Sequence, residues 1–259
     1  MDCREIGAKT KLLGVLGEKI SYSLSPRIHN FSFSKIGVNA IYVVFDVPSS
    51  RFDKTIKGLL ELTYGINVTI PYKERVISHL DDLTSEAERI GAVNTVHERR
   101  GYNTDYLAIK SLVSSKFNSG GSALILGAGG ASRAAAFALG DLGYKILIVN
   151  RTRERGEELV SKLSEHGINA RFTTGCNADY EILVNTIPDP SAVPMDCVKG
   201  KLVVEFVYDK ESPFLRRARE LGMKVIDGLE ILVRQAMEAE KIWFGKSLED
   251  SEVVRTIAG

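Results

Sequence analysis

The chain has 259 residues, a net charge of +1 and 44% hydrophobic residues. This length allows one large domain or two modest ones, and the composition is ordinary for a globular protein. The near-neutral charge gives no indication of nucleic-acid binding. No apolar run reaches the roughly 18–20 residues of a membrane span, and the first residues lack the apolar stretch of a signal peptide. We therefore expect a cytoplasmic protein.

Cysteine and histidine usage indicates neither a disulfide framework nor a metal site. The cysteines are few, odd in number and far apart, and they form no CxxC motif: Cys3, Cys176 and Cys197. This pattern is expected of a protein in a reducing compartment. The histidines are scattered without the spacing of metal ligands: His29, His79, His97 and His166.

The first hundred residues alternate between strand and helix patterns. Apolar or β-branched runs predict strands at residues 10–16, 41–45, 65–70 and 92–97. Helices are predicted at residues 52–62 and 85–90, and a further helix begins at Ser25-Pro26. There we expect Ser25 to be the N-cap and Pro26 the first helical residue. This alternation predicts an α/β fold with a largely parallel sheet.

A second α/β unit follows Asp105, after residues 111–122, which are rich in Ser, Gly and Lys. The predicted strands are residues 122–126, 145–149, 182–185, 202–206 and 225–227, and the predicted helices are residues 132–142, 153–166 and 213–221. A last helix, residues 229–243, has no strand after it, so we expect it to pack back on the first domain. The chain then forms one domain from residues 1–105 and 229–259 and another from residues 106–228.

Residues 127–132 form a glycine-rich turn between a predicted strand and a predicted helix. Gly127, Gly129 and Ser132 occupy the three small-residue positions of the dinucleotide-binding fingerprint. The first position permits a tight turn, the second lets the backbone approach a pyrophosphate, and the third allows close helix–strand packing. Ser132 weakens the match slightly, and a glycine-rich turn without a ligand is the alternative.

The segment after the next strand indicates which dinucleotide is bound. An acidic residue there would hold a free ribose 2′-hydroxyl, but the segment reads Asn150-Arg151-Thr152-Arg153-Glu154-Arg155. Arginine donors at this place suit a 2′-phosphate. NADP is therefore favoured over NAD, with a solvated basic helix start as the alternative.

Polar residues gather at predicted strand ends of the first domain. Ser23 and Ser25, with Asn67 and Thr69, would form a site of neutral donors and acceptors that suits a polyol. Lys73 follows Pro71 just past a strand end, where ligands bind in open α/β sheets. A solvated lysine, and an N-cap role for Asp105, are the ordinary alternatives.

Several ordered motifs resemble those of the shikimate dehydrogenase family along nearly the whole chain. Residues 23–30 resemble its SxSPxxHN stretch, residues 67–74 its NVTxPxKE segment, residues 91–95 its GAVNT motif and residues 103–105 its NTD motif. Residues 127–131 and 150–155 resemble its NADP-binding loops, and residues 207–208 and 228–236 its VY and GLxMLVxQA segments. The resemblance implies a substrate-binding domain, a Rossmann-type NADP-binding domain and a C-terminal helix that returns to the first domain.

The resemblance also implies roles for individual residues. Lys73 and Asp105 would be catalytic. The implied substrate contacts are Ser23, Ser25, Thr69, Asn94, Tyr208 and Gln235. The implied NADP contacts are Gly127, Ala128, Gly129, Gly130, Ala131, Asn150, Arg151, Thr152, Arg155, Thr186, Phe206 and Gly228.

The implied reaction is the reversible, NADPH-dependent reduction of 3-dehydroshikimate to shikimate, on the route to aromatic amino acids. Lys73 would donate or accept the proton and Asp105 would orient it. Because free lysine has a pKa of about 10.4, Lys73 would need a lowered pKa or would act mainly as a fixed electrostatic donor.

Three departures from the family pattern stand out: Tyr22 before the first serine, Asn185-Thr186-Ile187-Pro188, and no glycine after Asp105. A quinate/shikimate dehydrogenase that uses NAD or NADP, or a silent homologue that binds nucleotide or shikimate, remains an alternative. The sequence does not determine the oligomeric state, and a homodimer is the assembly that we expect.

Overall fold

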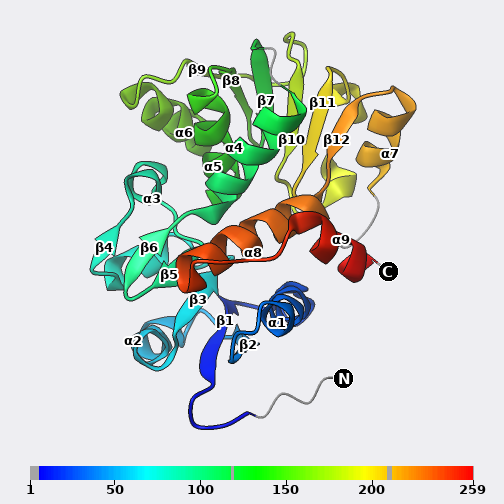
Figure 1. Ribbon diagram of the computed structural model, residues 1–259. Helices are drawn as coiled ribbons and strands as arrows, with labels where there is room; N and C mark the ends of the chain where they lie inside the picture. The colour runs from blue at the N-terminus through cyan, green and yellow to red at the C-terminus, as the bar shows by residue number, and fades with distance from the viewer. Residues whose placement is uncertain (1–5, 118–119, 209–211, 259) are drawn as a thin grey trace. The chain divides into compact units, whose positions relative to one another are not determined.

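The computed structural model describes residues 6–117, 120–208 and 212–258. The chain divides into two compact units, one of residues 1–104 with 233–259 and one of residues 105–232. Each unit is an α/β structure, as the sequence predicts, and each is built around its own six-stranded sheet (Figure 1). Helices α4 (Thr104–Lys116) and α8 (Gly228–Phe244) carry the chain across the division.

The first unit has a mixed sheet in the order β2-β1-β3-β5-β6-β4. Its strands are β1 (Lys11–Gly17), β2 (Ala40–Asp46), β3 (Gly65–Val68), β4 (Asp82–Leu83), β5 (Thr95–His97) and β6 (Arg100–Tyr102). Strand β1 runs parallel to β2 and β3, whereas β5 is antiparallel to both β3 and β6. The sequence patterns did not predict β4 and β6, which are only two and three residues long.

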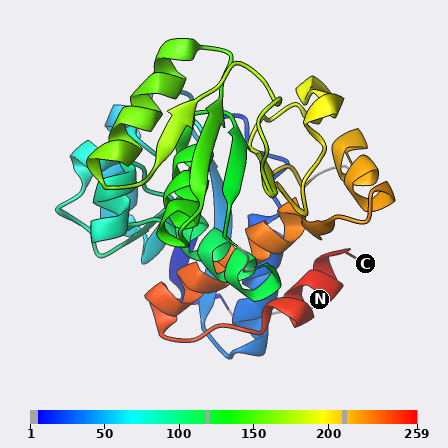
Figure 2. The same ribbon diagram turned by 90° about the horizontal axis from the view of Figure 1, so that it is seen from above.

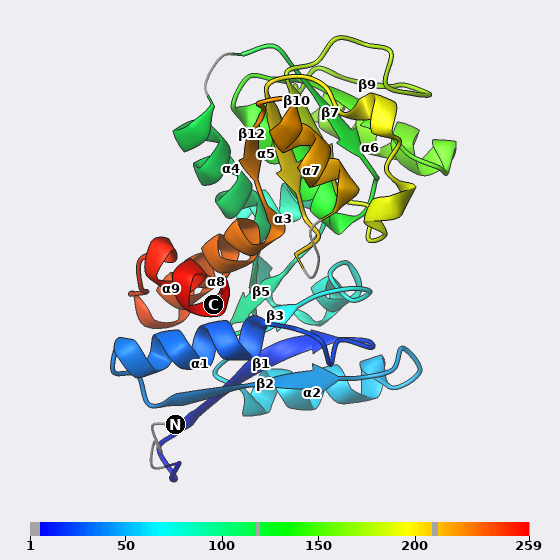
Figure 3. The same ribbon diagram turned by 90° about the vertical axis from the view of Figure 1, so that its right-hand side faces the viewer.

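Helices cover both faces of this sheet. The helical segments are α1 (Ser25–Lys35), α2 (Phe52–Leu62), the 3-10 helix η1 (Arg75–His79), α3 (Ser85–Ile90) and α9 (Asp250–Ala258), with the C-terminal part of α8. Phe52 and Ile56 of α2 pack with Leu16 on one side. Phe33 of α1 and Trp243 of α8 join the core on the other, and Figure 3 shows α1 alongside β1 and β2. The last helix therefore returns to the first unit.

The second unit has a fully parallel sheet in the order β12-β11-β10-β7-β8-β9. Its strands are β7 (Ser122–Leu126), β8 (Lys145–Val149), β9 (Ala170–Phe172), β10 (Ile182–Asn185), β11 (Leu202–Glu205) and β12 (Lys224–Ile226). The helices are α5 (Gly130–Asp141), α6 (Arg153–Glu165), η2 (Pro190–Ala192), η3 (Met195–Cys197) and α7 (Pro213–Glu220). This strand order is the doubly wound arrangement of dinucleotide-binding domains, and Figure 2 shows the neighbouring strands β7 and β8, both in green.

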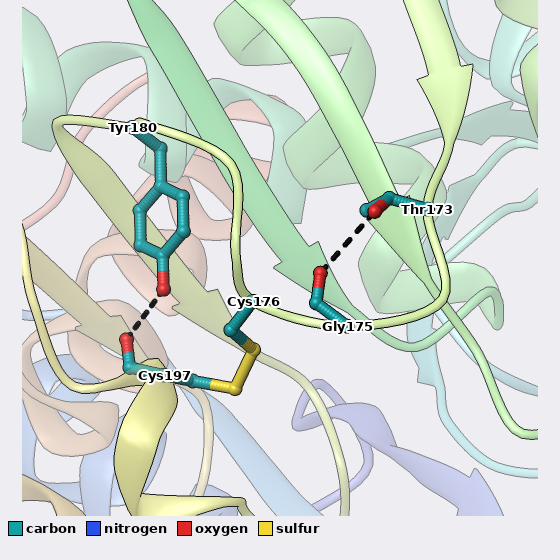
Figure 4. Close-up of a disulfide and its surroundings, with 5 residues drawn as sticks. All are labelled: Thr173, Gly175, Cys176, Tyr180 and Cys197. Atoms are coloured by element: carbon teal, nitrogen blue, oxygen red, sulfur yellow. Dashed lines mark hydrogen bonds between the residues drawn. A yellow bond between two sulfur atoms is a disulfide. The ribbon is translucent and has the colours of Figure 1, made fainter.

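A disulfide in the second unit corrects the expectation drawn from cysteine usage. Cys176 and Cys197 are bonded across 21 residues of sequence, and both lie in the core (Figure 4). The Tyr180 hydroxyl donates to the Cys197 carbonyl oxygen at 2.7 Å beside the bond. Spacing alone could not predict this pairing, because the fold brings together the segment after β9 and the segment before β11.

Local structure differs from prediction at several places, and strand β5 begins at Thr95 rather than at residue 92. Strand β3 ends at Val68 rather than at residue 70, because the chain turns there, with the Tyr72 N–H donating to the Thr69 carbonyl. Ser25 is the first residue of α1 and not its N-cap, which is Leu24. Strand β9 and helix α9 were not predicted. Among the described helices, none combines the length and apolar character that a membrane crossing requires.

Candidate active site

A buried polar cluster forms at the centre of the first unit from Asn67, Asn94, Thr95, Thr104 and Gln235. The Asn94 Oδ1 accepts from the Thr104 backbone N–H at 2.7 Å, and the Asn94 Nδ2 donates to the Thr104 Oγ1 at 3.0 Å. The Gln235 Oε1 accepts from the Thr104 hydroxyl at 3.3 Å. Gln235 of α8 therefore lies beside Asn94, and both are residues that the sequence assigned to substrate binding.

The backbone on either side of Asn94 fixes its position. The Asn94 N–H donates to the Tyr102 carbonyl at 3.0 Å, and the Asn94 carbonyl accepts from Val68 at 2.8 Å. The Val93 N–H donates to the Lys73 carbonyl at 2.8 Å, so the segment that carries Lys73 is tied to the same place. Gly91, with φ of 68°, provides the left-handed turn that ends α3 ahead of this segment.

Tyr42 of β2 connects the cluster to helix α1. Its hydroxyl donates to the Asn67 Oδ1 at 2.6 Å. The Asn30 side chain pairs with both backbone groups of Tyr42, at 2.8 and 3.0 Å, as a neighbouring strand would. Burial raises the pKa of Tyr42 well above its ordinary value, the charge of Glu240 raises it further, and a hydrogen bond with Ser25 opposes both. Ser25 thus contacts Tyr42 rather than capping its helix.

A buried carboxylate fixes helix α8 against helix α1. The Glu240 Oε1 lies 2.8 Å from the His29 Nδ1, and the Glu240 Oε2 accepts from the Ser32 hydroxyl at 2.5 Å. All three side chains are fully buried. The His29 ring stacks on Tyr42, with centroids 4.2 Å apart. The interaction holds the helix of Gln235 against the helix that begins at Ser25.

The other residues assigned to the substrate lie around strand ends. The Ser23 hydroxyl accepts from the Ser25 N–H at 3.3 Å, which orders the entry to α1. The Thr69 N–H donates to the Leu16 carbonyl at 2.8 Å, just beyond the end of β3. Both side chains are partly exposed, and so is that of Lys73. This end of β1 and β3 therefore presents hydroxyl groups and an ammonium group.

Asp105 lies in the first turn of α4, directly after Thr104 of the polar cluster. The residue is 7% exposed. A carboxylate in the first turn of a helix is stabilised by the helix dipole. Lys73 belongs to the first unit and Asp105 to the second.

The glycine turn of the second unit has the geometry that a pyrophosphate requires. Gly127 has φ of 118°, and a Cβ there would collide with the hydroxyls of Thr186 and Ser132. Apart from Gly129 itself and its two chain neighbours, no atom of the described residues lies within 4 Å of where a Cβ on Gly129 would stand. Gly129 caps α5, so Gly130 and the residues after it present backbone N–H groups beside that space.

Ser132, the departure at the third position of the fingerprint, has a specific partner. Its hydroxyl lies 2.6 Å from the Thr186 hydroxyl, which donates to the Leu126 carbonyl at 2.8 Å. The small side chain thus links the glycine turn to the segment after β10. Ala128 and Ala131 complete the turn without bulk that would exclude a ligand.

The segment after β8 carries three exposed arginines, Arg151, Arg153 and Arg155. Asn150 donates through Nδ2 to the Thr152 carbonyl at 2.7 Å and shapes the turn. Arg153 is paired with Glu157 at 2.8 Å. Within the described part of the chain, neither Arg151 nor Arg155 has an ion-pair partner, which suits a role in binding an anionic group.

Sequence reasoning missed several residues of these networks, among them Tyr42, Thr104 and Glu240. The sequence does contain a pattern that could have identified Glu240. It continues the apolar stripe of α8 through positions 233, 236 and 237, and a charged residue on a buried face requires a partner. No local pattern identified Tyr42, because its partners lie on other elements. In the described residues, no group of His, Cys, Asp and Glu side chains could hold a metal ion.

Comparison with known proteins decides the family. Residues 15–96 match the model of the shikimate dehydrogenase substrate binding domain, and residues 111–188 match the model of shikimate / quinate 5-dehydrogenase. A shikimate dehydrogenase of Sulfurisphaera tokodaii is 52% identical over 251 residues, which cover 96% of this chain and 95% of the relative. The chain belongs to the shikimate dehydrogenase family.

Other members of the shikimate dehydrogenase family agree in sequence and fold. The enzyme named shikimate dehydrogenase (NADP(+)) in Saccharolobus islandicus is 52% identical over 256 residues, covering 96% of this chain and 95% of the relative. The structure of shikimate 5-dehydrogenase from Thermus thermophilus, in complex with NADP(H) and shikimate, superposes with a TM-score of 0.85. It is 34% identical and covers 96% of this chain and all of its own.

Proposed function

We propose that this protein is an NADP-dependent shikimate dehydrogenase, which interconverts 3-dehydroshikimate and shikimate. The observation that carries the proposal is the 52% identity, over nearly the full length of both chains, to a relative named for this activity with NADP(+). We assign substrate binding to residues 1–105 with 229–259 and NADP binding to residues 106–228. The cytoplasmic location expected from the sequence is part of the proposal, and disulfides do occur in some intracellular proteins.

The second unit has the features that NADP needs. Space above Gly129 and the backbone N–H groups at the start of α5 suit the pyrophosphate. Arg151 and Arg155 are exposed just beyond β8, where a 2′-phosphate is held in such folds. Bound NADPH would supply the hydride. The chain's own task is to hold the substrate, exclude water and move one proton.

The first unit supplies groups for a hydroxylated carboxylic acid. Asn94 and Gln235 are held together by Thr104, and Ser25 is fixed by Tyr42. These neutral donors and acceptors suit the hydroxyl groups of shikimate, and we assign Ser23, Thr69 and Tyr208 to the same ligand. In reduction, the carbonyl oxygen at C3 gains the proton as the carbon gains hydride. We assign that proton to Lys73 and its orientation to Asp105.

Turnover measured with each pairing of NADP or NAD with shikimate or quinate tests the proposal. We expect shikimate with NADP to have the highest kcat/KM. Preferred turnover of quinate, or equal use of NAD, would instead identify a quinate/shikimate dehydrogenase. Binding of NADP without any turnover would indicate a silent homologue. We propose that the protein assembles as a homodimer. Sedimentation of the purified protein tests this assembly.

A further inference from the structure

The mechanism above gives no role to the buried carboxylate of Glu205. Glu205 and Asn185 are the last residues of the neighbouring parallel strands β11 and β10 and are paired in register. Both side chains are fully buried. A buried carboxylate is retained at a cost in free energy unless its oxygens are satisfied. Glu205 therefore requires a structural or functional reason.

Hydrogen-bond donors surround the carboxylate. The Asn185 Nδ2 donates to both oxygens of Glu205, at 2.9 and 3.1 Å. The Val207 backbone N–H donates to one oxygen at 3.0 Å, and the Ser212 hydroxyl donates to the other at 3.3 Å. The Asn185 Oδ1 in turn accepts from the Ile187 N–H at 3.0 Å. Each side chain thus holds the segment just beyond its own strand.

These two segments lie at the nicotinamide side of the expected cofactor site. In a doubly wound sheet, the dinucleotide crosses the carboxyl ends of the strands where the strand order reverses. Here the reversal lies between β7 and β10. The adenosine half belongs over β8, beside Arg151, so the nicotinamide half belongs over β10 and β11. Asn185 and Glu205 end those two strands.

Further contacts hold the same segments. Thr186 donates to the Leu126 carbonyl and contacts Ser132 of the glycine turn. A Cβ on Gly228 would collide with the Val207 carbonyl and lie 2.9 Å from the Tyr208 nitrogen. The backbone at residues 207–208 is therefore packed against Gly228 on one side and bonded to Glu205 on the other.

We propose that Glu205 is a positioning residue for the nicotinamide half of the cofactor. Its carboxylate acts through the Val207 backbone and through Asn185. One group thereby fixes the positions of both segments, residues 206–208 and residues 186–188. The inference rests on the proposed function and adds a residue that touches neither ligand. A carboxylate is suited to this place because its backbone and amide partners are all donors, whereas glutamine would turn an NH2 group toward one of them.

The test separates the two halves of the cofactor. Binding of NADP+ and of 2′,5′-ADP, which carries only the adenosine half, is measured by calorimetry on Glu205→Gln. We expect NADP+ affinity to fall roughly 10- to 100-fold, the effect of losing a buried hydrogen bond to a charged group. Affinity for 2′,5′-ADP should change by less than about twofold, as expected for a distant site. The kcat for shikimate oxidation should fall as well.

Tyr180→Phe is the matched control. It removes a buried hydrogen bond from the same unit, to the Cys197 carbonyl, just before the opposite end of β10. We expect lower thermal stability but unchanged kcat and unchanged preference between the two ligands. If Glu205→Gln weakens both ligands equally, or leaves NADP+ binding and kcat at wild-type values, Glu205 is merely structural and the proposal is wrong.

A second variant keeps the test decisive if Glu205→Gln does not fold. Asn185→Ala removes the shared amide and should also weaken NADP+ more than 2′,5′-ADP, whereas equal weakening of the two ligands would overturn the proposal. Wild-type turnover with shikimate and NADP+ is measured in parallel. Absence of wild-type turnover would contradict the proposed function, and the two binding affinities would still decide the role of Glu205.

Discussion

The Tyr42 hydroxyl donates a 2.6 Å hydrogen bond to the Asn67 side chain in the interior of the first unit. Asn67 is in turn hydrogen-bonded to the next residues of the cluster. Its Nδ2 donates to the Thr95 hydroxyl at 2.9 Å and to the Asn94 carbonyl at 3.2 Å. Tyr42 also contacts Ser25. A tyrosine with no direct part in the chemistry thus connects two residues that we assign to the substrate, Ser25 and Asn94.

Changing Tyr42 to Phe should lower both stability and substrate affinity. The Asn67 Oδ1 would lose its donor in a buried place, which costs about 1–3 kcal/mol in the free energy of unfolding. The KM for shikimate should rise, with little change in the KM for NADP. Urea unfolding and steady-state kinetics measure the two effects. Tyr64→Phe, which loses a hydrogen bond to the Trp243 carbonyl in the same unit, should leave the KM for shikimate unchanged.

Removing the disulfide should destabilise the protein without changing its chemistry. Cross-linking a loop of this length, Cys176 to Cys197, stabilises a folded chain by roughly 3 kcal/mol in the chain-entropy model. Cys176→Ala should therefore lower the free energy of unfolding by about that amount while kcat is retained. Reductant should lower the stability of the wild type and of Cys3→Ala but not that of Cys176→Ala. Three reactive thiols in the denatured wild type, titrated without reductant, would show that the bond does not form.

Glu205 should give stability a distinct pH dependence. Burial raises the pKa of Glu205 above its ordinary value of 4.5 more than its hydrogen bonds lower it. Between the ordinary and the raised pKa, the folded state binds more protons than the unfolded state, so stability falls as the pH rises. Urea unfolding across this range should show that fall in the wild type and in Tyr180→Phe. In Glu205→Gln the contribution should be absent, and an unchanged slope would contradict the assignment.

The exposed arginines should determine the choice of cofactor. Arg151→Ala should raise the KM for NADP roughly 10- to 100-fold, the effect of one lost hydrogen bond to a charged group. The KM for NAD should change little, because NAD has no 2′-phosphate. Arg153→Ala is the control, since Arg153 is engaged with Glu157 and should affect neither cofactor. Equal increases with NADP and NAD would argue against a 2′-phosphate contact at Arg151.

Features with a local cause could be predicted from the sequence. The glycine turn and its flanking strand and helix were predicted because periodicity and φ requirements act over a few residues. Features set by partners distant in sequence could not. Ser25 is a residue type that strongly favours the N-cap position. Its side chain is instead hydrogen-bonded to Tyr42, which lies 17 residues later. In the sequence, Glu205 lies near the end of an ordinary strand pattern. Only the pairing of β11 with β10 brings Asn185 beside it.

Lys73 and Asp105 provide the most direct test of the chemistry. General acid–base groups typically contribute ~10²–10⁴-fold to the rate, so Lys73→Ala should lower kcat within that range. Its backbone carbonyl, not its side chain, holds Val93, so the fold and the KM for shikimate should change little. Asp105→Asn keeps the shape of the side chain but removes its charge, and it should also slow turnover strongly.

The double variant tests whether the two groups act on the same proton. Residues that act as a unit are non-additive, so Lys73→Ala with Asp105→Asn should be hardly slower than the slower single variant. Lys57→Ala, on an exposed face of α2, is the control for loss of a lysine and should retain wild-type kcat. Multiplicative losses in the double variant would mean that the two residues act independently. Near-normal turnover in Lys73→Ala, with the protein folded and NADP bound, would leave Lys73 an ordinary surface lysine and assign the proton to another group.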